Sequence, residues 1–214
     1  MTSKLILIRH GETEWNATGR IQGHRPVSLN ERGHKQAQAV ALRLQYEPFN
    51  ALYSSDLERT VQTAEAIANL TQHTIHTDAR LREWDLGILS GLKRTEAEAQ
   101  HPDAYAIYNE GRIDEPIPNG ESIHNRYTRV TTCLEEVAAK HPNQTLVIVT
   151  HGGPLGDCYR RATNLPFDKP LDVELYNGGL NIITIDNSSW TLDTWGDIDH
   201  LKDIGSMGDW EGRK

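Results

Sequence analysis

The sequence is poor in cysteine and has no long apolar run. Cys133 and Cys158 are the only cysteines among 214 residues and do not lie in a paired spacing, which favours a reducing compartment over a disulfide framework. The apolar run at residues 5–8 is too short for a membrane span or a signal peptide. We therefore expect a cytoplasmic protein that does not insert into a membrane.

The chain also lacks an excess of basic residues. It has 30 Asp and Glu against 22 Lys and Arg, which gives a formal net charge of -8. Binding to nucleic acid or to an anionic membrane usually depends on a basic surface, so neither partner is expected. A small anionic substrate would instead need a local cluster of basic side chains.

Length and composition are those of a globular protein. Hydrophobic residues make up 37% of the chain and charged residues 24%, close to the average for soluble domains. A chain of 214 residues most naturally forms one large domain. We assign residues 1–196 to this domain and residues 197–214 to a polar C-terminal tail.

Apolar runs and helical periodicities alternate along the chain. Residues 5–8 and 146–149 are apolar throughout, a pattern typical of parallel strands buried on both faces. Further strands are expected at 51–53 and 73–77, with a late hairpin at 180–185 and 190–195. Helices are expected at 30–44 with Asn30 as N-cap, at 57–68 capped from 54–56, at 96–108, at 123–137 and after Pro154. This order predicts a three-layer α/β/α fold with a mostly parallel central sheet and one antiparallel strand.

Basic side chains follow the predicted strands. The two most apolar strands end at His10, preceded by Arg9, and at His151. The strand at 51–53 leads into a predicted helix that carries Arg59 in its first turn. Because the carboxyl ends of parallel strands meet at one edge of the sheet, these four basic groups are predicted to share one pocket.

Such a pocket suits a phosphoryl group. Guanidinium groups grip phosphate oxygens bidentately, and helix N-termini add backbone N–H donors. The permanent cations Arg9 and Arg59 disfavour protonation of His10, which leaves a neutral ring nitrogen able to attack phosphorus. The pattern predicts phosphoryl transfer through a phosphohistidine at His10. Two arginines also disfavour a divalent cation, so neither a metal nor a cofactor is expected.

A leaving alkoxide needs a proton donor. Glu83 and Asp85 lie in a glycine-containing stretch that follows the predicted strand at 73–77. A carboxylic acid placed there could protonate the leaving oxygen. We predict Glu83 as the general acid, with Asp85 in reserve.

Residues 7–16, Leu-Ile-Arg-His-Gly-Glu-Thr-Glu-Trp-Asn, resemble the signature of the histidine phosphatase superfamily, in the branch that contains cofactor-dependent phosphoglycerate mutases and related phosphatases. The resemblance continues in family order through five further segments, 19–23, 54–60, 81–83, 120–122 and 150–153. It implies a phosphoglycerate mutase-like fold. It also implies that His10 is the phosphorylated nucleophile, that Arg9, Arg59 and His151 bind the transferring phosphoryl group, and that Glu83 donates the proton.

The same resemblance suggests where the substrate binds. It implies phosphate contacts from Asn16 and the backbone N–H of Gly152, and substrate contacts from Gln22 and Gly23. His24 stands where the family's phosphatases often have an aromatic residue, so it is a further candidate for substrate contact. Mutases of the family carry a longer insertion than the segment after Gly91 here, which favours a phosphatase for small phosphorylated metabolites.

Three other functions remain open from the sequence alone. A phosphoglycerate mutase would use the same residues. A binding module for phosphorylated ligands would keep the pocket without turnover, and a metal hydrolase would use His10, Glu12 and His151 as ligands. The sequence also leaves open a homodimer formed through a sheet edge.

Overall fold

A computed structural model describes residues 2–206, which form a six-stranded sheet in the order β3-β2-β4-β1-β5-β6. The strands are β1 Thr2–Arg9, β2 Ala51–Ser54, β3 Ile75–Thr77, β4 Thr145–Thr150, β5 Leu180–Asp186 and β6 Ser189–Asp197. β5 pairs antiparallel with both of its neighbours, whereas all other pairs are parallel. The predicted mostly parallel sheet with one antiparallel strand is confirmed.

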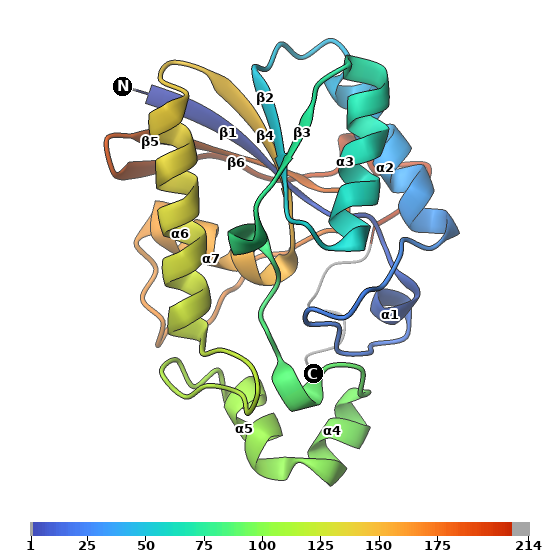
Figure 1. Cartoon of the computed structure of the whole chain (residues 1–214), viewed down its shortest axis with the longest axis vertical. Coiled ribbons are helices and arrows are strands. Elements are labelled where there is room, and N and C mark those ends of the chain that lie inside the picture. Colours follow the sequence, from blue (N-terminus) through green and yellow to red (C-terminus); the bar gives the residue numbers. More distant parts are fainter. Residues whose placement is uncertain (1, 207–214) are drawn as a thin grey trace.

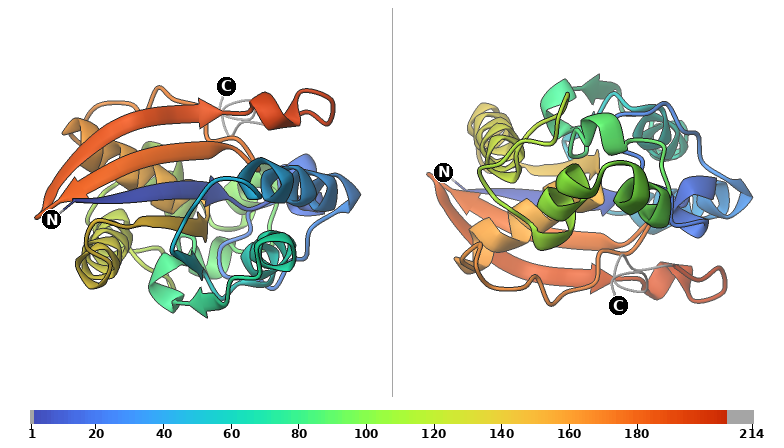
Figure 2. Two further views of the ribbon diagram at one scale, coloured as in Figure 1. Left: turned by 90° about the horizontal axis from the view of Figure 1, so that it is seen from above. Right: turned by 90° about the horizontal axis from the view of Figure 1, so that it is seen from below.

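Helices cover both faces of this sheet (Figures 1 and 2). The helices α2 Glu31–Leu44 and α3 Glu58–Thr71 pack on one face, and α6 Ile123–Lys140 and α7 Gly152–Thr163 pack on the other. β1 alternates between the two cores: Leu5 and Leu7 pack on the α6 side, Ile6 and Ile8 on the α2 side. Burial on both faces explains why this strand is apolar throughout.

The sequence located most helices but misjudged two details. The stretch expected as one helix at 96–108 is two helices, α4 Arg94–Gln100 and α5 Pro102–Glu110. Pro102 has no backbone N–H and disfavours helical geometry at the residue before it, and His101 has φ -138° and ψ 60°. Asn30 caps α2 as predicted, because its Oδ1 accepts a bond from the N–H of Gly33 at 2.8 Å.

The N-cap of α3 was predicted wrongly. Leu57, not one of the polar residues at 54–56, occupies the N-cap, and within the described residues it forms no side-chain capping bond. The hydroxyl of Ser55 accepts a bond from the N–H of Leu57 at 3.3 Å and also contacts His151.

A small separate layer lies beyond the carboxyl ends of the strands, with α4 and α5 at its far side (Figure 1). Trp84, Leu89 and Ile117 belong to its apolar core. The 3-10 helix η2 Gly87–Leu89 belongs to this layer. Two other short elements lie outside its apolar core, the helix α1 Glu14–Ala17 and the 3-10 helix η1 Ala79–Leu81, whose Leu81 packs on the α6 side of the sheet. None of the three was predicted, because elements this short show no periodicity. This layer covers the end of the sheet where the basic residues were expected.

The division of the chain at residue 196 stays a prediction. In the predicted tail, the described part contains η3 Asp199–Leu201, whose Leu201 is buried, and Ser206 donates a hydrogen bond to the carbonyl of Asn177 at 2.7 Å. Residues 207–214 lie outside the described residues. None of the helices described in 2–206 is both long and apolar enough to cross a membrane.

Candidate active site

The two histidines that follow β1 and β4 lie side by side. Arg9 pairs with Thr150 across these parallel strands, so the next residues, His10 and His151, emerge together at the sheet edge. Their ring centroids are 5.2 Å apart in an edge-on arrangement, and both side chains are buried. The structure thus brings together the pair predicted from the sequence.

The hydrogen bonds of His10 determine which ring nitrogen is free to react. Nδ1 lies 2.7 Å from the carbonyl oxygen of Gly11, which can only accept, so Nδ1 carries the proton. Nε2 therefore holds the lone pair, and it accepts a bond from Nε of Arg59 at 3.3 Å. Asn177 donates to the carbonyl of His10 at 2.9 Å and holds the backbone in place. Nε2 is therefore the ring nitrogen of His10 that carries an available lone pair.

Burial and charge keep both imidazoles neutral. Burial first, and then the cations Arg59 and Arg9, hold the pKa of His10 well below its usual value of 6.5. Burial and Arg59 likewise hold the pKa of His151 well below this value. His151 is oriented by a contact of 2.9 Å between its Nε2 and the hydroxyl of Ser55. Its buried Nδ1 has no hydrogen-bond partner in residues 2–206.

The two predicted arginines are buried in the same pocket. Arg59 is 1% exposed and also donates to the carbonyls of Gly23 at 2.9 Å and Arg25 at 3.2 Å. Burial lowers the pKa of Arg59 to about 10, so it remains a cation at neutral pH. Arg9, also buried, donates to the carbonyl of Leu175. The structure thus places the four basic residues that follow the strands close to one another.

Glu83, which follows η1, lies against the N-terminus of α7 at this site. Its Oε1 accepts bonds from the backbone N–H of Trp84 at 2.8 Å and of Gly153 at 3.0 Å. Its own carbonyl is held by Arg129 Nη2 at 2.7 Å. A Cβ at position 153 would lie 2.2 Å from Oε1 of Glu83, so a larger residue there would displace this carboxylate. The carboxylate is therefore positioned by backbone donors and lies close enough to Arg59 to interact with its charge.

Asp85, the reserve acid, has structural partners. Its Oδ1 accepts a bond from the N–H of Gly87 at 3.1 Å, and its Oδ2 lies 3.7 Å from Nδ1 of His24. Nε2 of His24 contacts the carbonyl of Glu83 at 2.7 Å. His24 thus supports the backbone at Glu83.

The other residues that the resemblance implies as substrate contacts have different surroundings in the structure. Gly152 is the first residue of α7 and is buried, and the carbonyl of Gly23 is bound by Arg59. Oε1 of Gln22 is buried without a hydrogen-bond partner in the described chain. Asn16 uses its Oδ1 for the capping box of α1, accepting from the N–H of Thr13 at 3.1 Å. The substrate-binding roles of these residues stay predictions.

Two residues that orient the histidines were missed by the sequence reasoning. Ser55 was interpreted as a capping residue, although it follows β2 at the same sheet edge as the histidines and could have been found by that position. Asn177 lies between α7 and β5 in a segment without periodicity, where the sequence gives no signal. Ser55 orients the ring of His151, and Asn177 holds the backbone of His10, each through one hydrogen bond.

The acidic residue considered as a metal ligand has other partners. Oε1 of Glu12 accepts a bond from Asn30 at 2.9 Å, and Oε2 lies 3.6 Å from Nη1 of Arg32. In the part of the chain that the structure describes, His, Cys, Asp and Glu side chains form no group of three that could hold a metal. Glu12 thus contributes to the packing of the loop against α2.

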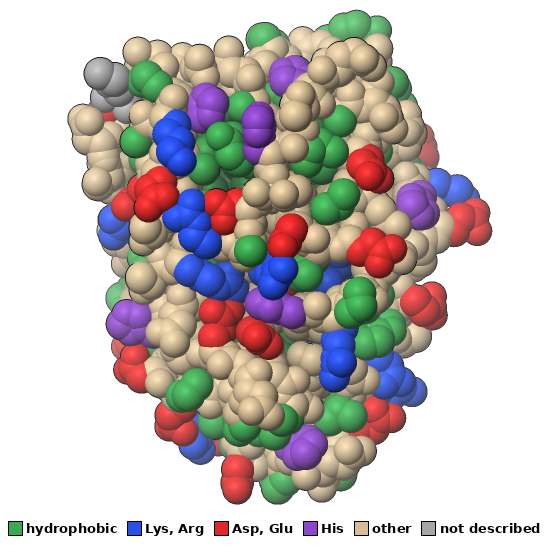
Figure 3. All heavy atoms as spheres, in the orientation of Figure 1, with side chains coloured by type: hydrophobic (Ala, Val, Ile, Leu, Met, Phe, Trp, Pro, Cys, Tyr) green, Lys and Arg blue, Asp and Glu red, His purple; other side chains and the backbone are tan. Residues whose placement is uncertain are grey.

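On the face shown in Figure 3, Lys and Arg side chains gather across the middle of the molecule, with Asp and Glu side chains among them. This is the level at which the strands end in Figure 1. The mixture of signs fits a chain of net charge -8. The two arginines beside His10, Arg9 and Arg59, are themselves buried, so they add little to the charge of this surface.

The buried histidines predict that stability falls in mild acid. Above pH 7.5 both imidazoles are neutral in the folded and the unfolded chain. Below pH 6.5 both histidines are protonated in the unfolded chain but stay neutral in the folded protein, because burial lowers their pKa values there. For each unit by which the pH falls below 6.5, we expect each histidine to lower the free energy of unfolding by about 1.4 kcal/mol.

Urea denaturation between pH 7.5 and 5.5 measures this effect. Carboxylates also contribute to the slope, so the comparison is between the wild type and His10→Gln, which carries no titratable group at the site. The variant should show a slope smaller by up to one proton. Equal slopes in both proteins would contradict a neutral, buried His10.

Comparisons with known proteins agree with this geometry. The family model of the histidine phosphatase superfamily (branch 1) matches residues 5–198. Phosphoglycerate mutase-like protein 4 of Arabidopsis thaliana is 40% identical over 96% of this chain and 90% of its own length. Metal-independent phosphoserine phosphatase of the same plant is 38% identical over 96% of this chain and 86% of its own length.

Solved structures show the same fold. YhfR of Bacillus stearothermophilus superposes with a TM-score of 0.85 at 28% identity, over 94% of this chain and 100% of that chain. A phosphoserine phosphatase from Entamoeba histolytica in complex with 3-phosphoglyceric acid gives a TM-score of 0.81 at 29% identity, over 93% of this chain and 99% of that chain.

Proposed function

Since the chain belongs to the histidine phosphatase superfamily, we propose that it is a phosphatase that hydrolyses small phosphomonoesters through a phosphohistidine at Nε2 of His10. The observation that carries this proposal is the environment of that atom. Its lone pair faces a buried guanidinium, and its pKa is held well below 6.5 by burial and by two arginines. A neutral imidazole in a cationic pocket is a competent nucleophile toward an anionic phosphoryl group.

In the first step the phosphoryl group transfers to His10. Arg9, Arg59 and the unpartnered Nδ1 of His151 are placed to bind its oxygens, together with the N–H of Gly152 at the N-terminus of α7. Nε2 attacks phosphorus in line, and the bond between phosphorus and the ester oxygen breaks. Protonated Glu83 transfers its proton to the leaving oxygen, so that a neutral alcohol departs.

In the second step water attacks the phosphohistidine. The carboxylate of Glu83 accepts the proton of this water, the bond between phosphorus and Nε2 breaks, and inorganic phosphate forms. His10 regains its lone pair and Glu83 its proton. The arginines stabilise the charge that builds up on the phosphoryl oxygens in both steps.

Names of relatives support a small substrate. One relative is named a phosphoserine phosphatase, and one solved neighbour holds 3-phosphoglyceric acid. Because another is named phosphoglycerate mutase-like, mutase activity is the alternative to measure. A homodimer formed through an edge strand, β3 or β6, stays a prediction that analytical ultracentrifugation would test.

The test of the proposal is an assay of phosphate release. The wild type is incubated with p-nitrophenyl phosphate and a panel of sugar phosphates, phosphoserine and phosphoglycerates in the presence of a chelator. We expect inorganic phosphate to be released from at least one metabolite. Interconversion of phosphoglycerates that exceeds phosphate release would instead identify a mutase, and tight binding without turnover would identify a binding module.

The role of Glu83 predicts a dependence on the leaving group. Glu83→Gln removes the transferable proton, so kcat for alkyl phosphates should fall by about 10²–10⁴-fold. The loss for p-nitrophenyl phosphate should be much smaller, because nitrophenolate leaves without a proton. Asp85→Asn is the matched control and should change kcat less than about threefold for either substrate. A larger loss in Asp85→Asn than in Glu83→Gln would assign the acid to Asp85.

A further inference from the structure

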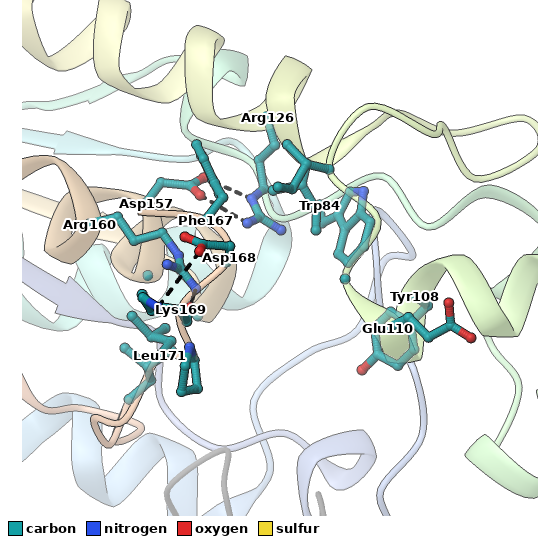
Figure 4. A pocket seen from close by; sticks show the side chains of 18 of the residues that line it. Trp84, Tyr108, Glu110, Arg126, Asp157, Arg160, Phe167, Asp168, Lys169 and Leu171 are labelled. Atoms are coloured by element: carbon teal, nitrogen blue, oxygen red, sulfur yellow. Dashed lines mark hydrogen bonds and ion pairs between the residues drawn. The ribbon is translucent and has the colours of Figure 1, made fainter. Parts of the chain in front are cut away.

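A second pocket adjoins the site next to Glu83. It has a volume of about 480 Å³ and lies between α5, α6, the start of α7 and the segment at 167–171 (Figure 4). Gly152 and Gly153 form part of its wall, so it is continuous with the N-terminus of α7 where Glu83 is held. The part of a substrate that leaves past Glu83 would enter this pocket.

Arg126 is the charged side chain built into this pocket. It is 8% exposed and forms a bidentate pair with the buried Asp157, at 2.8 Å from Nε and 2.9 Å from Nη2. Its guanidinium also lies over the ring of Trp84, 5.1 Å from the centroid. Figure 4 shows it held between Asp157 and Trp84. Asp157 raises the pKa of Arg126, so the pair keeps the guanidinium charged despite its burial.

The Nη1 group of Arg126 lies near Glu83. Asp157 engages two of the five N–H groups that a guanidinium carries. Nη1, which Asp157 does not use, lies beside Gly153, and a Cβ at that glycine would be 3.0 Å from Nη1 and 2.2 Å from Oε1 of Glu83. The proton donor for the leaving oxygen and a guanidinium edge are thus immediate neighbours.

The other cations of the pocket are used differently. Arg160 donates to the carbonyls of Pro166 at 2.6 Å and Lys169 at 2.9 Å, which holds the segment after α7. Lys169 is exposed and lies 3.8 Å from the carboxylate of Asp168. One guanidinium edge with a single charge, itself balanced in part by Asp157, matches a planar monoanion better than a second phosphate dianion.

We infer that Arg126, positioned by Asp157 and Trp84, determines specificity by binding a carboxylate on the leaving-group half of the substrate. The preferred substrates are then phosphomonoesters of short hydroxy acids, because the guanidinium edge lies next to the group that protonates the ester oxygen. This inference rests on the proposed phosphatase function. It adds a carboxylate subsite that is separate from the residues that hold the phosphoryl group.

Two pairs of substrates test the inference in the wild type. 3-Phosphoglycerate is compared with glycerol 3-phosphate, and phosphoserine with phosphoethanolamine, since each pair differs in the carboxylate. We expect kcat/KM to be at least tenfold higher for the acid in both pairs. A preference below threefold in both pairs would overturn the inference, even if phosphate release itself is efficient.

The variant Arg126→Gln should abolish this preference. We expect kcat/KM for 3-phosphoglycerate and phosphoserine to fall about 10- to 100-fold, mainly through KM, while values for their partners and for p-nitrophenyl phosphate change less than about threefold. Lys169→Gln removes the same charge from the pocket rim and should leave the ratios unchanged. Ratios that survive in Arg126→Gln, or that collapse equally in Lys169→Gln, would overturn the assignment to Arg126.

The burial of Asp157 requires a second variant. If Arg126→Gln also loses activity toward p-nitrophenyl phosphate, the test uses Arg126→Lys, which keeps a cation next to Asp157. Thermal unfolding first shows whether this variant is as stable as the wild type. It should retain hydrolysis of p-nitrophenyl phosphate and show a reduced ratio in both substrate pairs, because an ammonium lacks the bidentate edge. An unchanged ratio in Arg126→Lys would overturn the inference. Loss of all phosphate release in the wild type would instead refute the phosphatase proposal.

Discussion

The variant His10→Ala should have kcat/KM for p-nitrophenyl phosphate lowered by at least about 10⁴-fold, because removal of a nucleophile typically costs 10⁴–10⁶ in rate. Water would then have to attack the phosphomonoester directly in a pocket arranged for Nε2 of His10. The binding groups Arg9, Arg59 and His151 remain, so the variant should still bind inorganic phosphate. It should form no acid-labile phosphoenzyme.

The control for this variant is a histidine outside the site. His34 lies exposed on α2, and His34→Ala should keep kcat/KM within about twofold of the wild type, as surface substitutions usually do. Because His10 is buried, thermal unfolding of both variants shows whether the fold is intact. A folded His10→Ala protein that retained phosphate release would refute His10 as the nucleophile.

Arg59→Met should produce the second largest loss of activity. This buried guanidinium contacts Nε2 of His10, and in the proposed mechanism it binds the transferring phosphoryl group. Loss of such a group costs about 10³–10⁵ in kcat in phosphoryl-transfer enzymes. The variant has a further effect on pH dependence. Arg59 lowers the pKa of His10, so its removal raises that pKa, and the acid limb of the kcat/KM profile should move to higher pH.

Two further variants separate charge from geometry at this position. Arg59→Lys keeps a cation and should leave the acid limb near its wild-type position, but it cannot hold Nε2 of His10 and the carbonyl of Gly23 together, so kcat/KM should stay low. Arg82→Met removes a partly exposed arginine paired with Asp56 and should change kcat/KM less than about threefold. If Arg59→Met retained both wild-type activity and its pH profile, the phosphate-binding role would be wrong.

The sequence predicted the centre of this site because its residues follow from strand geometry. Apolar runs that end at His10 and His151 must deliver them to one sheet edge if the strands are parallel and adjacent, and β1 and β4 are adjacent. Arg59 followed from its place in the first turn of α3, directly after the next strand along the sheet. These inferences need the order of elements and no side-chain packing.

Other features depended on packing that periodicity does not contain. Three adjacent polar residues follow β2, and only the fold shows that Ser55 turns toward His151. Arg126 and Asp157 lie on different helices, so their pairing follows from how α6 packs on α7. The break at His101 is different, because the proline that follows it announces a helix boundary in the sequence itself.

Burial and charge together set the protonation states in this pocket. Neutral imidazoles and charged guanidinium groups coexist because burial lowers the pKa of both kinds of group from very different starting values. The pKa of His10 falls well below 6.5, whereas that of Arg59 falls only to about 10, so the histidine is neutral and the arginine is charged at neutral pH. The nucleophile therefore stays available at pH values where the phosphate group is increasingly dianionic. In the proposed mechanism, the cations that bind the phosphoryl group also keep His10 neutral and able to attack it.

The most direct measurement of this account is the identity of the phosphorylated atom. The wild type is mixed with labelled p-nitrophenyl phosphate, quenched in base within milliseconds, digested and analysed by peptide mapping, and the intermediate is observed by ³¹P NMR. The account predicts an acid-labile, base-stable phosphoryl group on Nε2 of His10. A phosphoryl group on Ser55 or His151, or turnover without any phosphoenzyme under conditions where its formation is faster than its breakdown, would contradict it.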